Sequence, residues 1–582
     1  MRWPAARPAL LSLAALILFA PAAVRLAPVV PAGRAAQAAA PQRPARLTLA
    51  GSLKLEPSGQ DVHADVAVSG NVAFVGMWSG PCPGGGVDLI DISNPAAPVR
   101  VGHTPEHPNT SMEVMRPLRI GARDVLAIGL QDCRKAGQPP GRAGLELVDV
   151  TDPHAPAELS FFDVDSFGVR AIGVHELDVT RSPSGRSLAL LAAPLLEPAT
   201  AGSDGTGGKG DLLIVDISDP VRPALVGSWG VLGDPALGMP VYQGVRRGND
   251  ARTLLHSVRA RHDGRVAYLS YWDAGVILLD ISEPARPRYL GRTAFGPDDE
   301  GNAHSVAEAR GGAMIVEADE VLDASELRVS GPALDGPALA APATFAGQLR
   351  GGVSISAPVV FVGRGCAGDA YAADPSGKLA LVERGACRID QKVALAQRAG
   401  ASGVIVFDEA ANPDDLGPVG GDRSVAVPGG PAVDVTIPAV MVRRDVGLRL
   451  RDAAQPAMAT AGTGFGGYGD LRLWNVSDPA HPAQVGRFAT PEAHDQSAAG
   501  GLWSVHNPEV RGNTLYASWY SDGVRVVDIT RPSAPRELAA WKGEDRPAGA
   551  PAVDIWGVAV RDDLVLASDR SYGLYVLRLT RE

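Results

Sequence analysis

One phrase of sequence recurs along this chain and limits the folds that it can adopt. The phrase has the form LxIVDISDPxxPxLVG, and its six copies are Val87–His103, Leu145–Phe162, Leu212–Trp229, Val276–Arg292, Leu471–Phe488 and Val524–Trp541. Each copy reads as an apolar strand, a turn of Asp or Asn with Pro, and an edge strand after a second Pro. Another extended pair precedes each copy, so the unit has four short strands. Antiparallel units repeated about every 60 residues predict β-propeller blades.

The two ends of the chain complete each other in this scheme. The last unit, Asp554–Thr580, supplies three strands, and a candidate for the missing outer strand is Ala45–Leu55. Pairing these segments buries two sheet edges that would otherwise be exposed. The sequence therefore predicts a mainly β fold, a seven-bladed β-propeller closed by an N-terminal strand.

A carboxylate ends the third strand in five of the six copies. These residues are Asp91, Asp149, Asp216, Asp280 and Asp528, and the remaining copy has Asn475. Asparagine keeps the turn-forming side chain but not the charge. We therefore interpret the repeated aspartate as a turn former rather than a catalytic group.

The net charge and the N-terminal segment indicate where the protein acts. A formal net charge of −11 argues against a nucleic acid or an anionic membrane as the main partner. Arg2 and Arg7 flank the start of an apolar stretch, Ala9–Ala23, that is too short for a comfortable membrane span. This pattern predicts a signal peptide and a secreted, extracytoplasmic protein with no membrane span in the mature chain. An uncleaved anchor is the alternative.

The four cysteines fit an oxidising compartment. They include no C-x-x-C, which excludes a zinc ribbon or a thioredoxin-type site. Cys82 and Cys133 fall in equivalent loops of neighbouring blades, so we expect a disulfide between them. The other two are Cys366 and Cys387.

One interval between copies is about three times as long as the others. It begins after Ala313–Glu320 and ends before Gly469–Pro479. Inside it, Gly377–Ala410 (GKLALVERGACRIDQKVALAQRAGASGVIVFDEA) predicts a strand, a cysteine-containing turn, a helix from about Ile389 to Arg398, and a second buried strand.

Both parts of the chain resemble known families. The repeated phrase resembles that of LVIVD-repeat β-propeller proteins, and the insert resembles the α/β protease-associated (PA) domain over residues 357–453. We place the signal peptide and linker in 1–46, blades one to five (first part) in 47–320, the inserted region in 321–467, and the rest of blades five to seven in 468–582. The position of the insert places it between the second and third strands of blade five. The resemblance implies a non-catalytic accessory module with a disulfide between Cys366 and Cys387. Unpaired cysteines are the alternative.

Histidines recur where the first strand of a blade begins. They are His63, His175, His256, His304 and His506, with Glu113 near the equivalent point of blade two and Trp556 in blade seven. First strands line a propeller's channel, so we expect these side chains to ring one mouth of it, beneath the insert.

Two interpretations of this ring remain open. In the first, each imidazole fills the same packing slot in its own blade. In the second, His256 and His304 bind zinc or copper, with His506 or His175 as a third ligand. A calcium site from Asp298, Asp299 and Glu300 is disfavoured, because this run lacks the alternate-residue spacing of known calcium loops.

The functional prediction follows from these features. The chain has no G-x-S-x-G and no H-E-x-x-H protease signature. We predict an exported, monomeric, non-catalytic binding protein that takes a peptide, glycan or protein at the channel mouth and the PA domain. The ligand-binding candidates are Asp298, Asp299, Glu300 and Trp556. The alternatives are an oxidative or hydrolytic metal-dependent enzyme that uses the channel histidines, and an accessory subunit of a separate protease.

Overall fold

The computed structural model describes residues 45–581 except 58–61, 79–81, 83–84, 168–172, 195–209, 232–247, 249–252, 350, 412, 455–456 and 498–499. The predicted signal peptide lies outside the described residues. No helix within the described ranges combines the length and the apolar character needed to cross a membrane.

Seven four-stranded antiparallel sheets account for most of the described strands. The first four are β2 (His63–Ser69), β3 (Val72–Met77), β4 (Val87–Asp91) and β5 (Val99–His103); β6 (Thr110–Ile120), β7 (Arg123–Asp132), β8 (Gly144–Asp149) and β9 (Ala157–Asp163); β10 (Glu176–Arg181), β11 (Ser187–Ala192), β12 (Leu212–Asp216) and β13 (Ala224–Trp229); and β14 (Ser257–Ala260), β15 (Val266–Ser270), β16 (Val276–Asp280) and β17 (Arg288–Arg292). The other three are β18 (Ala303–Ala309), β19 (Met314–Asp319), β29 (Leu471–Asn475) and β30 (Ala483–Phe488); β31 (Pro508–Arg511), β32 (Thr514–Ser518), β33 (Val524–Asp528) and β34 (Arg536–Trp541); and β1 (Ala45–Lys54), β37 (Gly573–Arg581), β36 (Leu564–Asp569) and β35 (Ile555–Arg561).

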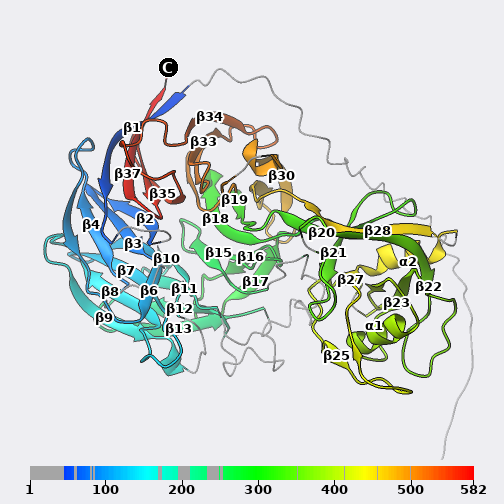
Figure 1. Cartoon of the computed structure of the whole chain (residues 1–582). Helices are drawn as coiled ribbons and strands as arrows, with labels where there is room; N and C mark the ends of the chain where they lie inside the picture. The colour runs from blue at the N-terminus through cyan, green and yellow to red at the C-terminus, as the bar shows by residue number, and fades with distance from the viewer. Residues whose placement is uncertain are drawn as a thin grey trace, which may run out of the picture. The chain divides into compact units, whose positions relative to one another are not determined.

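The sheets form a seven-bladed ring around their first strands. Each first strand contacts the first strand of the next sheet, in the order β2, β6, β10, β14, β18, β31 and β35, and β35 contacts β2 again. The seventh sheet contains both ends of the described chain, because β1 pairs antiparallel with β37 from Ala45↔Arg581 to Lys54↔Gly573. In Figure 1 the blue N-terminal strand lies beside the red C-terminal strand. The predicted propeller and its closure by an N-terminal strand are confirmed.

The repeated phrase explains how neighbouring sheets pack. The glycine of its fourth strand lies against the turn of the following sheet, so closely that a Cβ would meet the carbonyl oxygen of the turn's first proline at 1.7–2.3 Å. The five glycines are Gly51, Gly102, Gly227, Gly291 and Gly486, and their partners are Pro95, Pro153, Pro284, Pro479 and Pro532. Gly51 belongs to β1 and Pro95 to the first sheet, so the closing strand makes the same contact as the others.

The repeated aspartate holds the turn together. The Asp91 carboxylate accepts a hydrogen bond from the Ser93 backbone N–H at 2.8 Å, and Asn475 accepts the corresponding bond from Ser477 at 3.0 Å. A local side-chain bond of this kind stabilises a turn and needs no charge. The turn-forming interpretation of this position therefore agrees with the structure.

The chain between β19 and β29 forms a separate module. Its closed barrel contains β20 (Ser325–Ser330), β21 (Ala338–Pro342), β27 (Ala439–Val442), β24 (Gly403–Phe407), β23 (Leu379–Glu383), β22 (Ser354–Phe361) and β28 (Ala457–Phe465). A two-stranded sheet, β25 (Ser424–Val425) with β26 (Val433–Asp434), and two helices, α1 (Ile389–Arg398) and α2 (Arg444–Asp452), complete it. The helix α1 has the bounds expected from the sequence.

Both expected disulfides are formed. Cys82 is joined to Cys133, which connects the first and second sheets of the ring, and Cys366 is joined to Cys387 within the module. Intact disulfides are typical of proteins outside the cytoplasm.

Candidate functional site

Four of the five predicted histidines meet at one end of the channel. We call His175, His256, His304 and His506 the histidine cluster. Successive rings lie 4.3, 4.0 and 4.4 Å apart between centroids, in the order given. Each residue lies within two residues of the start of a first strand, so the ring of sheets brings together residues that are far apart in the sequence. His256, His304 and His506 are buried.

Two backbone carbonyls orient two members of the cluster. The Nδ1–H of His256 donates to the His304 carbonyl at 3.0 Å, and the Nδ1–H of His506 donates to the Trp556 carbonyl at 2.7 Å. In a neutral imidazole this assignment leaves Nε2 as an acceptor with a free lone pair. Burial holds the pKa of both histidines well below the ordinary value, so both are neutral at pH 7.

His175 behaves differently because a carboxylate faces it. Its Nδ1 lies 2.8 Å from Glu113 Oε2, and its Nε2 lies 2.7 Å from His256 Nε2. Burial is the largest single effect and lowers the pKa of His175, but the carboxylates of Glu113, Glu176 and Glu320 act together against it, and the pKa lies above its ordinary value. A protonated His175 donates to both Glu113 and the lone pair of His256.

A second carboxylate, Glu320, faces the other half of the cluster. Its Oε2 lies 3.5 Å from His304 Nε2, and its Oε1 lies 4.0 Å from His506 Nε2. The Tyr520 hydroxyl donates to Oε1 at 2.5 Å, and burial beside this carboxylate raises the pKa of Tyr520 well above its ordinary value. Sequence reasoning did not single out Glu320 or Tyr520.

Aromatic rings cover the cluster. Trp272 lies 5.0 Å from His256, Tyr520 lies 5.1 Å from His506, and Trp556 lies 4.4 Å from His506, measured between ring centroids. Trp272 and Tyr520 occupy tight turns with φ of 50° and 35°. Bulky residues rarely adopt this region, and such strain gathers at functional sites. Trp272 lies in the turn Tyr271–Gly275 (YWDAG), and Tyr520 lies in the similar turn Trp519–Gly523 (WYSDG). The recurrence of this turn is the sequence signal that could have predicted aromatic rings beside the histidine cluster.

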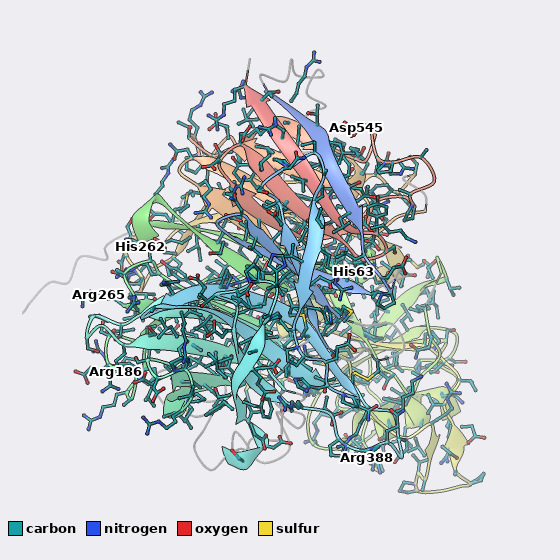
Figure 2. The ribbon with its side chains drawn as sticks, turned by 90° about the vertical axis from the view of Figure 1, so that its left-hand side faces the viewer. His63, Arg186, His262, Arg265, Arg388 and Asp545 are labelled. Carbon is teal, nitrogen blue, oxygen red and sulfur yellow. A yellow bond between two sulfur atoms is a disulfide. The ribbon has the colours of Figure 1, made fainter. Side chains whose placement is uncertain are left out.

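The remaining predicted site residues lie elsewhere or have other partners. His63, labelled in Figure 2, is buried at the start of β2, and neither ring nitrogen has a hydrogen-bond partner among the described residues. Asp298 pairs with Arg443 at 2.9 Å, and Asp299 pairs with Arg472 at 3.3 Å. These two carboxylates therefore connect segments of the chain to one another, and Glu300, which follows them, is buried.

Three groups of side chains could hold a metal ion, among the residues that the structure describes. Two of them are buried and share His304: Glu113 with His256 and His304, and His304 with Glu320 and His506. Within each group the ligand atoms lie within 4.8 Å of one another. The third group, His107, Glu146 and Glu158, lies away from the cluster and includes an exposed residue.

A pocket of about 810 Å³ occupies the channel further along the first strands. All seven first strands contribute to its lining, as expected of a central channel. Its walls carry charges of both signs, which include Asp65, Arg116, Asp178, Arg259, Glu308 and Arg511. Two ion pairs connect neighbouring first strands at the pocket: Arg116 pairs with Asp65 at 3.1 Å, and Arg259 pairs with the buried Glu176 at 2.7 Å.

Comparisons with known families agree with this architecture. A PA domain model matches residues 355–450, and an LVIVD repeat model matches residues 63–104, 207–230 and 263–294. The chain carries LVIVD repeats and a PA domain. These two components point to protein interaction or to a protease-associated role.

Individual proteins match different shares of the chain. An aminopeptidase of Pseudomonas aeruginosa is 45% identical over 51 residues, which are 9% of this chain and 9% of the relative. A zinc aminopeptidase from Bacillus subtilis is 24% identical over 28% of this chain and 36% of that chain, with a TM-score of 0.18. The C-terminal WD40 domain of Sif2 is 9% identical over 92% of this chain and 98% of that chain, with a TM-score of 0.38.

Proposed function

We propose that this protein is exported and acts outside the cytoplasm as a non-catalytic binding protein. The propeller channel takes a peptide, a protein segment or a glycan, and the PA domain offers a second recognition surface. The two disulfides support a location outside the cytoplasm.

The observation that carries the proposal is the channel pocket. Its volume of about 810 Å³ falls in the range of sites that bind small molecules or short segments. Its lining alternates acidic and basic side chains, so it complements a ligand that itself carries both charges or many hydrogen-bonding groups. A peptide has both properties. A glycan has only the second, and it is the other outcome of the test.

The matched relatives favour a second candidate, an accessory role beside a protease. Two of the matched proteins are aminopeptidases by name, and each alignment covers a small part of both chains. If the protein is an accessory subunit, the segment that binds in the channel pocket belongs to a protease or to the substrate of that protease.

The test is a binding measurement on the purified, disulfide-bonded protein. Peptide and glycan arrays identify a ligand, and calorimetry then measures its affinity for the wild type and two charge-reversal variants. Arg511 lines the pocket, so Arg511→Glu should weaken binding about tenfold. Arg222 also has an exposed side chain but lies outside the pocket lining, so Arg222→Glu should bind as the wild type does. The proposal fails if no peptide or glycan binds, or if both variants bind alike.

A further inference from the structure

Glu320, His304 and His506 form one of the two buried groups of possible metal ligands in the histidine cluster. The Nε2 of His506 has a lone pair that no hydrogen bond uses, because its Nδ1–H is committed to the Trp556 carbonyl. A metal-bound histidine typically has this arrangement, in which the other ring nitrogen donates to a backbone carbonyl or a carboxylate.

The spacing of the three ligand atoms suits a shared ion after a small contraction. Glu320 Oε2 lies 3.5 Å from His304 Nε2, and all three ligand atoms lie within 4.8 Å of one another. Neighbouring ligands of a tetrahedral ion with bonds of about 2.05 Å are about 3.4 Å apart. Small rotations of the His304, His506 and Glu320 side chains would bring their ligand atoms from the present separations to this distance.

The surroundings of the group complete this picture. The Tyr520 hydroxyl donates to the Oε1 of Glu320, which fixes the carboxylate and leaves Oε2 toward His304. His304 Nδ1 is buried with no hydrogen-bond partner among the described residues, so of the two histidines only His506 has its second ring nitrogen held by a backbone carbonyl.

We infer that the channel of this propeller holds one divalent transition metal ion, bound by His304 and His506 through Nε2 and by Glu320 through a carboxylate oxygen. Two imidazoles and a carboxylate without thiolates suit zinc or copper(II) rather than copper(I) or an iron–sulfur cluster. Calcium and magnesium prefer oxygen ligands alone. The site goes beyond the proposed binding function and does not depend on it.

The position of Glu320 gives the site a structural consequence. Glu320 immediately follows β19, where the chain leaves the propeller for the PA module, and Val321 N donates to Ser504 Oγ at 3.0 Å. An ion on Glu320 therefore ties the start of the connection to the histidines of two neighbouring sheets. Metal binding stabilises the folded junction by the free energy of binding.

The experiment measures metal binding by the full chain directly. Chelator-treated protein is titrated with Co²⁺, whose visible absorption bands report the coordination number of the bound ion, and zinc content is measured by mass spectrometry after dialysis against Zn²⁺. We expect about one ion per chain. His506→Ala and Glu320→Gln should each lower affinity by 100-fold or more, and Tyr520→Phe should lower it about 10- to 100-fold.

Two matched histidine variants keep the assignment falsifiable. His256→Ala removes a buried histidine of the cluster that belongs to the other metal-capable group, and His63→Ala removes one that belongs to neither. Both should retain the ion, with circular dichroism as the check that every variant folds. The inference is overturned if the wild type binds no metal, if His256→Ala loses it while His506→Ala keeps it, or if only His107→Ala abolishes binding.

Discussion

Alanine in place of a repeat glycine tests how adjacent sheets pack. Gly486 belongs to β30, and a Cβ there would lie 1.7 Å from the carbonyl oxygen of Pro532 in the next sheet. Real contacts of this kind are not shorter than 3.0 Å, so the two sheets must separate locally by about 1.3 Å. Overpacking of this kind costs about 1–3 kcal/mol, and the lower backbone entropy of unfolded alanine offsets about 0.5–1 kcal/mol. Gly486→Ala should therefore destabilise the propeller by roughly 1 kcal/mol, the difference between the middles of these two ranges.

Urea unfolding followed by tryptophan fluorescence is the suitable assay. Every tryptophan among the described residues lies outside the PA module, so fluorescence reports the propeller transition alone. The urea midpoint should fall while the slope stays constant, which indicates a change in stability rather than in the surface exposed.

The control replaces a glycine that has room for a side chain. Gly464 lies in β28 of the module, and a Cβ there would meet no atom within 4 Å. Gly464→Ala should leave the unfolding transition of the module, followed by circular dichroism, unchanged. The packing argument is refuted if Gly486→Ala also has the wild-type midpoint.

Three further predictions concern pH, a disulfide and the closing strand. Burial lowers the pKa of His63 from 6.5 to about 4, so between these two pH values the unfolded chain binds a proton that the folded chain does not. The stability of the folded protein should therefore fall as the pH decreases from 6.5 to about 4, by up to about 3 kcal/mol from this residue. His63→Gln should show a smaller decrease in urea midpoint than the wild type between neutral and acidic buffer. Replacing Cys366 and Cys387 by alanine opens a loop with a sequence separation of 21 and should cost about 3 kcal/mol in the module, seen by circular dichroism, while the tryptophan transition stays in place. Deleting residues 45–54 exposes the edge of β37 and should cause aggregation in light scattering; a monomeric variant with the wild-type midpoint would contradict closure by β1.

The fold follows from local signals that the sequence repeats. Strand periodicity and the Asp–Pro turn recur in six copies, so each copy supports the interpretation of the others. The helix α1 could also be placed, because its apolar spacing and the glycine after it act within a few residues. Closure by β1 followed from the strand that the last unit lacks.

The candidate site depends on long-range geometry, and the sequence indicated it only in part. Histidines at equivalent positions of the units predicted a ring, but a position at the start of a strand does not determine where a side chain points, and His63 is not part of the cluster. Glu320 directly follows β19 and is not part of the pattern that the units repeat, so the comparison of units could not reveal it. Asp299 looked like a free acidic ligand until the structure paired it with Arg472, which follows the whole insert in the sequence.

The central claim is that the ring of sheets brings His304, His506 and Glu320 together around a metal ion. Anomalous diffraction at the zinc absorption edge, from crystals of the full chain grown with Zn²⁺, tests this directly. We predict one strong anomalous peak within about 2.0–2.2 Å of His304 Nε2, His506 Nε2 and a Glu320 oxygen. No peak in the channel, or a peak only beside His107, Glu146 and Glu158, would contradict it.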